Sequence, residues 1–206
     1  MIHVPLRVRG AVINFYIFID VPDPSIKINS FIRYFERMPD EHLSVVYPIF
    51  VIDHNPNGGS GGGTIRRSRV ANFKGPRRER LTLVPDAMVD SLVIERGLGL
   101  ISIPRNRWER PAGRLVSTVL HEVGHSVDYE LGLTPSSRYT IQDVIGVTPT
   151  CGGGASGSIL RHMVEAYARY VVNPRRICRD SGSTHQQAID ALRSTRAFRQ
   201  MTNGVL

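Results

Sequence analysis

The pentapeptide HEVGH, residues 121–125, places two histidines four positions apart and a glutamate directly after the first. On an α-helix this spacing separates His121 and His125 by about 40° around the axis and about 6 Å along it. Two imidazoles so placed can bind one zinc ion, and the carboxylate of Glu122 can accept a proton from a water molecule that zinc activates. The spacing predicts a zinc hydrolase. The alternative is a structural helix that carries two partly exposed histidines.

The segment around this motif has the pattern of a long helix, predicted over residues 112–131. Leu115, Val119 and Val123 give it an apolar face. Gly124 lowers helix stability by about 1 kcal/mol relative to alanine, yet it stands between the two histidines. Because glycine has no side chain, it leaves room at this position, and we expect another segment to pack there, close to the metal.

Catalytic zinc needs a third protein ligand, with the fourth position left to water. A second long helix is predicted over about 158–172, and Glu165 is an acid among its apolar residues. Because an unpaired buried carboxylate is costly, Glu165 is expected either to bind the metal or to pair with Arg161 or Arg169, each four residues away. His162 shares a helix face with Glu165 and is the rival ligand.

Asp128 follows His125 by three residues, where the metzincin pattern has a glycine, and Leu131 stands where that pattern has its third histidine. The metzincin pattern is therefore absent. Asp128 lies on the histidine face of the predicted helix. It is expected either to orient a ligand histidine by a hydrogen bond or to be a solvated surface residue.

HEVGHSVD, followed forty residues later by EAYA, resembles the gluzincins, which are zinc peptidases with a glutamate ligand on a later helix. Within them the stretch 115–170 looks most similar to the family of the anthrax lethal factor catalytic domain and the Pro-Pro endopeptidases. The resemblance implies a two-lobed α+β peptidase with ligands His121, His125 and Glu165 and the base Glu122. It also implies an extended substrate beside an edge strand, here LGLISIP at 98–104.

One feature of that family is missing. Its tyrosine seven residues before the glutamate ligand, which stabilises the oxyanion, is replaced by Ser158. The oxyanion donor must then be another side chain. The candidates are Tyr139, His162, Tyr167 and His185.

The remaining sequence predicts strands and helices in the first half and mostly helices in the second. Strands are expected over 3–9 and 11–19 with a turn at Gly10, and over 43–53, 81–85 and 98–104; further helices are expected over 26–38, 86–97 and 184–201. Several connections look too short for crossovers, so we expect antiparallel strands. The order predicts a zincin-like α+β fold: a small mixed or antiparallel sheet with the active-site helix in a lobe over about 1–131, then a mostly helical lobe over about 132–206 of the same domain.

Two stretches between these elements are compositionally unusual. GGSGGG, residues 58–63, lacks a following GK[ST] and is interpreted as a hinge or linker rather than a phosphate-binding loop. The segment 64–80 carries seven basic residues against one acid. Sparse aromatic residues in it argue against nucleic acid, yet it supports an alternative function as a non-catalytic or DNA-associated zinc protein.

The overall composition is that of a folded, basic chain. It has 206 residues, 41% of them hydrophobic, and a net charge of +8 that comes almost wholly from arginine. No apolar run is long enough to span a bilayer, and no classical signal peptide is seen, which leaves the compartment open and permits an exported toxin or effector. Cys151 and Cys178 flank the predicted 158–172 helix and would form a disulfide if the protein works outside the cytosol.

Taken together, these patterns predict a single-domain zinc metalloendopeptidase that cleaves peptide or protein substrates. Glu122 is the predicted general base, and His121, His125 and Glu165 are the predicted zinc ligands.

Overall fold

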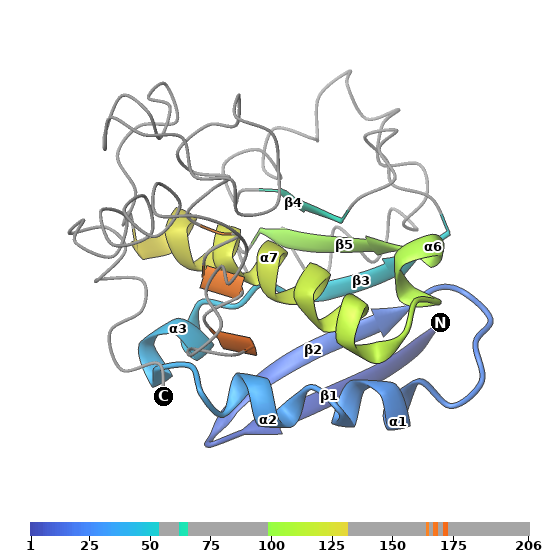
Figure 1. Ribbon diagram of the computed structural model, residues 1–206, viewed down its shortest axis with the longest axis horizontal. Coiled ribbons are helices and arrows are strands. Elements are labelled where there is room, and N and C mark those ends of the chain that lie inside the picture. Colours follow the sequence, from blue (N-terminus) through green and yellow to red (C-terminus); the bar gives the residue numbers. More distant parts are fainter. Residues whose placement is uncertain (54–61, 66–98, 132–163, 165–166, 169–170, 173–206) are drawn as a thin grey trace, which may run out of the picture.

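The computed structural model describes residues 1–53, 62–65, 99–131, 164, 167–168 and 171–172 (Figure 1). The predicted strand 81–85 and the predicted helices 86–97 and 184–201 lie outside these residues, as do both cysteines. Of the predicted second lobe, residues 164, 167–168 and 171–172 are described, and all are helical. No helix in the described part of the chain has the length and apolar character to cross a membrane.

Five strands form one mixed sheet. They are β1 (Ile2–Val8), β2 (Ala11–Ile17), β3 (Ile49–Ile52), β4 (Gly63–Ile65) and β5 (Leu100–Pro104), in the order β1-β2-β3-β5-β4. β1 is antiparallel to β2, and β4 is antiparallel to β5. The central strand β3 runs parallel to both of its neighbours, β2 and β5. The expectation of antiparallel strands is therefore wrong for the centre of the sheet. Residues 18–48 supply the long helical crossover that a parallel β2–β3 pair requires.

The first two strands form the predicted hairpin. Arg9 and Gly10 both have positive φ, at 47° and 96°, which is the backbone of a tight two-residue turn. The Arg9 guanidinium also donates to the carbonyl oxygen of Met38 and lies 3.1 Å from a carboxylate oxygen of Asp40. The turn is thereby tied to the chain that follows the first helices.

The predicted helix over 26–38 is divided into α1 (Pro24–Asn29) and α2 (Ile32–Phe35). Its apolar face is preserved across the break, because Ile28, Phe31 and Phe35 are all buried. The predicted strand over 43–53 is shorter than expected. Its first residues belong to α3 (Asp40–Ser44), and β3 begins at Ile49, directly after Pro48. All four residues of β3 are buried, as a central parallel strand requires.

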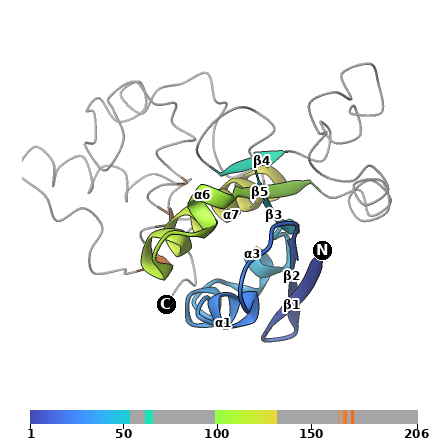
Figure 2. The same cartoon turned by 90° about the vertical axis from the view of Figure 1, so that its right-hand side faces the viewer.

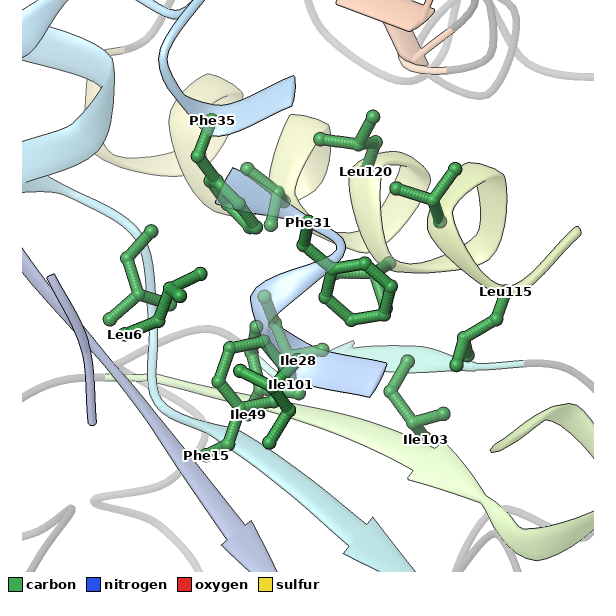
Figure 3. Close-up of a cluster of buried hydrophobic side chains, with 14 of the residues drawn as sticks. Leu6, Phe15, Ile28, Phe31, Phe35, Ile49, Ile101, Ile103, Leu115 and Leu120 are labelled. Atoms are coloured by element: carbon green, nitrogen blue, oxygen red, sulfur yellow. The ribbon is translucent and has the colours of Figure 1, made fainter. Parts of the chain in front are cut away.

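The long helix α7 (Ala112–Leu131) has the boundaries that the sequence predicts, and the short helix α6 (Arg105–Trp108) connects it to β5. The described helices lie along one face of the sheet (Figure 2). Between these two layers, strand side chains meet side chains from the helical layer, as Figure 3 shows. The labelled members of this core are Leu6, Phe15, Ile28, Phe31, Phe35, Ile49, Ile101, Ile103, Leu115 and Leu120.

Candidate active site

The two histidines and the glutamate of HEVGH line one cavity of about 520 Å³ at the surface of α7. Two residues on the preceding turn of α7, one residue of α6 and the segment that enters β4 supply other parts of the wall. The lining residues are Gly62, Gly63, Thr64, Arg107, Ser117, Thr118, His121, Glu122, His125 and Tyr129. The cavity is therefore assembled by the consecutive helices α6 and α7 together with the segment at β4, which is distant from them in sequence.

His121 and His125 face the same space from successive turns of the helix. Their ring centroids are 5.0 Å apart and the rings are nearly perpendicular, at 78°. Both side chains are half-buried and border the cavity. Two adjacent imidazoles on a regular helix are a donor pair that suits zinc, so this part of the site fits the predicted metal. Among the described residues no group of three His, Cys, Asp or Glu side chains is close enough to hold a metal ion.

Glu122 is buried beneath the segment that enters β4. Thr64 Oγ1 donates to Glu122 Oε2 at 2.7 Å. Gly62 passes so close that a Cβ atom there would lie 2.9 Å from both Cγ and Oε1 of Glu122. Burial raises the pKa of the Glu122 carboxyl, while the nearby His121 and the hydrogen bond from Thr64 act in the opposite direction.

This contact changes the interpretation of the glycine-rich stretch. Its last two glycines, Gly62 and Gly63, line the cavity, and Gly63 is the first residue of β4. The prediction of a hinge or linker over 58–63 is therefore wrong for these two residues, because Gly62 packs against the glutamate of the motif and Gly63 pairs with Ser102 of β5. The other four residues of the stretch, 58–61, lie outside the described part of the chain.

Other residues pack closely at Gly124, as the absence of a side chain there predicts, while the closeness of this contact to a metal stays a prediction. A Cβ atom there would lie 3.1 Å from Cδ1 of Tyr167 and 3.2 Å from Cβ of Val164. Val164 and Tyr167 therefore pack directly against α7 at Gly124, which stands between the two histidines in sequence. In sequence, Val164 is the residue before Glu165.

Tyr167 is not an oxyanion donor in this structure. It is fully buried, it does not line the cavity, and its hydroxyl shares a 2.9 Å hydrogen bond with Nδ1 of His42. The prediction that includes Tyr167 among the oxyanion candidates is wrong, because its ring is buried in the hydrophobic core and cannot reach the cavity. The other candidates, Tyr139, His162 and His185, lie outside the described residues, as does Glu165.

Asp128 is buried, with 5% of its surface exposed. The alternative of a solvated surface aspartate is therefore wrong. Its burial on the helix that carries both histidines agrees with a supporting role at the site, which remains a prediction.

The predicted edge strand is an interior strand. β5 pairs with β3 on one side and with β4 on the other, and β4 is the outermost described strand on that side of the sheet (Figure 1). A substrate strand therefore cannot pair with β5 along Leu100–Ser102, where β4 already lies. No local pattern in the sequence indicates this pairing, because β4 begins at the last glycine of a glycine-rich stretch.

Three other cavity residues have a spacing that could have revealed them. Ser117 and Thr118 precede His121 by four and three residues, and Tyr129 follows His125 by four, so all three lie on the histidine face of α7. The ring centroids of Tyr129 and His125 are 5.6 Å apart. Arg107, which comes from α6, has no such signal.

Comparison with protein-family models, with curated proteins and with solved structures gives no match for this chain.

Proposed function

We propose that this protein is a zinc-dependent metalloendopeptidase. One observation carries the proposal: His121, Glu122 and His125 line a single open cavity, with the glutamate held in a fixed position by the neighbouring strand. A structural helix with two incidental histidines would not require a second segment to fold tightly over the glutamate between them.

In the proposed reaction, His121 and His125 hold the metal and Glu122 transfers protons. Zinc, when bound, supplies a Lewis acid that polarises the scissile carbonyl and makes water a better nucleophile. Glu122 accepts the proton of the attacking water and passes it to the amine that leaves. Burial strengthens Glu122 as a base, and the hydrogen bond that Thr64 donates favours the ionised carboxylate that must accept the proton.

Glu165 is our proposed third ligand. The packing of its sequence neighbour Val164 on Gly124 supports this assignment, because it brings that segment onto the helix that carries both histidines. Tyr167 follows Glu165 by two residues in sequence, and its hydroxyl forms a hydrogen bond with His42 of α3. Such anchoring would fix the backbone from which a ligand must reach the metal.

We propose that the substrate binds in extended form beside β4. This strand is the outermost on its side of the described sheet, it contacts α7, and its residues Gly63 and Thr64 line the cavity. Exposed strand edges bind extended peptides through their unpaired backbone groups. A peptide there would lie next to the catalytic glutamate.

The test is cleavage of casein and of a mixed peptide library, with and without a chelator. Wild-type protein should cleave, the chelator should stop cleavage, and zinc should restore it. Glu122→Gln should lose at least 100-fold in kcat and retain its zinc, because the base is removed and the ligands remain. Glu41→Gln, an exposed glutamate on α3, is the matched control and should behave as wild type. Cleavage by Glu122→Gln at the wild-type rate would refute the mechanism.

A further inference from the structure

A second cavity, of about 610 Å³, lies where the strand β2 extends beyond its neighbour β3. β3 begins at Ile49, opposite Phe15, so in the described part of the chain no strand lies on that side of Ala11–Asn14. The helix α3, which contacts β2, and the residues that follow α3 form the opposite wall. The described lining of this β2 cavity shares no residue with that of the HEVGH cavity, so the two are separate sites.

The backbone groups of β2 point alternately to its two sides. Val8 and Ala11 pair across the two-residue turn, so Ala11 and every second residue after it exchange hydrogen bonds with β1. The residues between them direct their N–H and C=O groups to the other side, as the 2.9 Å hydrogen bond from the Phe18 N–H to β3 shows. Val12 and Asn14 therefore present backbone donors and acceptors on the side where β3 has not yet begun.

The opposite edge of the hairpin is protected against further strand pairing. Pro5 of β1 lies opposite Asn14 and has no backbone N–H, and at this position of the register that N–H would point away from β2. Proline at such an outward-facing position prevents other strands from adding to an edge. Ala11–Asn14 contains no proline. The sequence thus closes one edge of the hairpin and leaves the other open beside the β2 cavity.

Most polar side chains that line the β2 cavity have partners within the protein. Arg9 and Asp40, the charged residues of its described lining, form an ion pair at 3.1 Å. The Asn14 amide oxygen lies 2.9 Å from Nε2 of His3, and the Ser44 hydroxyl donates to a carbonyl oxygen of its own helix at 2.7 Å. The apolar lining residues are Ala11, Val12, Leu43, Val46 and Pro48. Recognition in this cavity therefore rests on the β2 backbone and on apolar contact rather than on charge.

We propose that the β2 cavity binds an extended, uncharged segment of a partner polypeptide, which adds to the sheet as a short strand beside Ala11–Asn14, in line with β3. Four residues of a strand span about 13 Å. Hydrogen bonds to Val12 and Asn14 hold the backbone of the segment, and its apolar side chains lie against Leu43 and Val46. This site is independent of zinc and of the proposed peptidase reaction.

The probes are acetylated and amidated hexapeptides in which Val, Ile, Leu or Phe alternates with Ser or Thr. Their affinity is measured with Glu122→Gln protein, so that cleavage does not remove the peptide. Residue-resolved amide hydrogen exchange is measured on the same protein with and without peptide. In dilute free protein the amides of Val12 and Asn14 should exchange faster than that of Ile13, which pairs with β1. Bound peptide should slow exchange at Val12 and Asn14.

Two proline variants locate the site. Val12→Pro removes a donor that faces the β2 cavity and should weaken binding tenfold or more, roughly, because its ring also stands where the peptide backbone lies. Arg7→Pro is the matched control, because Arg7 lies opposite Val12 and its N–H points outward from β1, as that of Pro5 would; affinity should stay within about twofold. On the peptide, N-methylation of alternate residues should abolish binding, and methylation of the residues between them should not. This pattern is read on protein without a proline substitution, so it decides the proposal even where Val12→Pro does not fold.

Three results overturn the proposal. The first is that no peptide of the set binds at millimolar concentration, or that binding ignores both Val12→Pro and the N-methylation pattern. The second is slow exchange of Val12 and Asn14 in dilute free protein, which assigns the open edge to a segment of this chain. The third is protection that rises with protein concentration alone, which assigns it to a second copy.

Discussion

Thr64 donates a hydrogen bond to the Glu122 carboxylate at 2.7 Å, across 58 residues of sequence. The donor belongs to β4, the outermost described strand on its side of the sheet, and the acceptor belongs to the helix α7. The same hydroxyl lies 3.0 Å from the backbone carbonyl oxygen of Glu122. The strand beside which we place the substrate therefore also orients the proposed base.

Replacing Thr64 by valine should slow the chemical step without weakening substrate binding. Thr64→Val keeps the shape of the side chain but removes the hydroxyl, so kcat should fall about tenfold, equivalent to about 1.4 kcal/mol, while KM stays within twofold. Thr64→Ser keeps the hydroxyl and should retain most of the activity. Steady-state kinetics on one peptide, with zinc content measured for each variant, separates these outcomes. Equal kcat for both variants would mean that Thr64 does not position the base.

The two helical glycines of α7 should respond in opposite ways to alanine. At Gly113 a Cβ atom meets nothing within 4 Å, so Gly113→Ala should raise the free energy of unfolding by up to about 1 kcal/mol through helix propensity. At Gly124 the new atom lies 3.1 Å from Cδ1 of Tyr167, 3.2 Å from Cβ of Val164 and 3.4 Å from the backbone Cα of Val164. Gly124→Ala should therefore lower the free energy of unfolding, by roughly 1–3 kcal/mol. Urea denaturation of both variants measures the difference, and stabilisation by Gly124→Ala would show that the contact is looser than described.

Stability should depend on the buried His42 in mildly acidic solution. Burial lowers its pKa to about 4, so the folded protein keeps His42 neutral while the unfolded chain protonates it near pH 6.5. The unfolded state therefore binds more protons between these values. Up to about 3 kcal/mol of stability, present above pH 6.5, should be lost as the pH falls from 6.5 to 4.

The measurement is the free energy of unfolding of metal-free protein as a function of pH. Metal-free protein excludes the loss of zinc as a cause. The double variant His42→Phe/Tyr167→Phe removes both members of the hydrogen bond and should lose most of the slope in this range. His3→Asn, at an exposed histidine, is the control and should keep it. An unchanged slope in the double variant would assign the pH dependence to other groups.

The parts of this molecule that follow local patterns were predictable, and the parts that depend on distant segments were not. The 3.6-residue period of α7 and the positive-φ turn at Gly10 depend on residues that are neighbours in sequence. The structure confirms both the helix and the turn. The parallel centre of the sheet and the placement of β4 depend on crossovers and strand pairing across many residues. Periodicity carries no information on such pairings. For the same reason HEVGH identified three cavity residues, whereas Thr64 and Arg107 emerged only from the fold.

The third zinc ligand is the decisive prediction for the site. Two histidines on one helix do not hold zinc tightly, so a further side chain must complete the set, and we expect Glu165. Glu165→Ala should lose zinc during dialysis against a mild chelator and should unfold at a lower temperature, because metal binding also stabilises the fold. His162→Ala, on the same predicted helix face, is the matched comparison and should retain most of its zinc. Zinc per chain is the measured quantity, with wild-type protein as reference. Full zinc in Glu165→Ala together with loss in His162→Ala would make the site a three-histidine centre, and the gluzincin resemblance would then not extend to its metal.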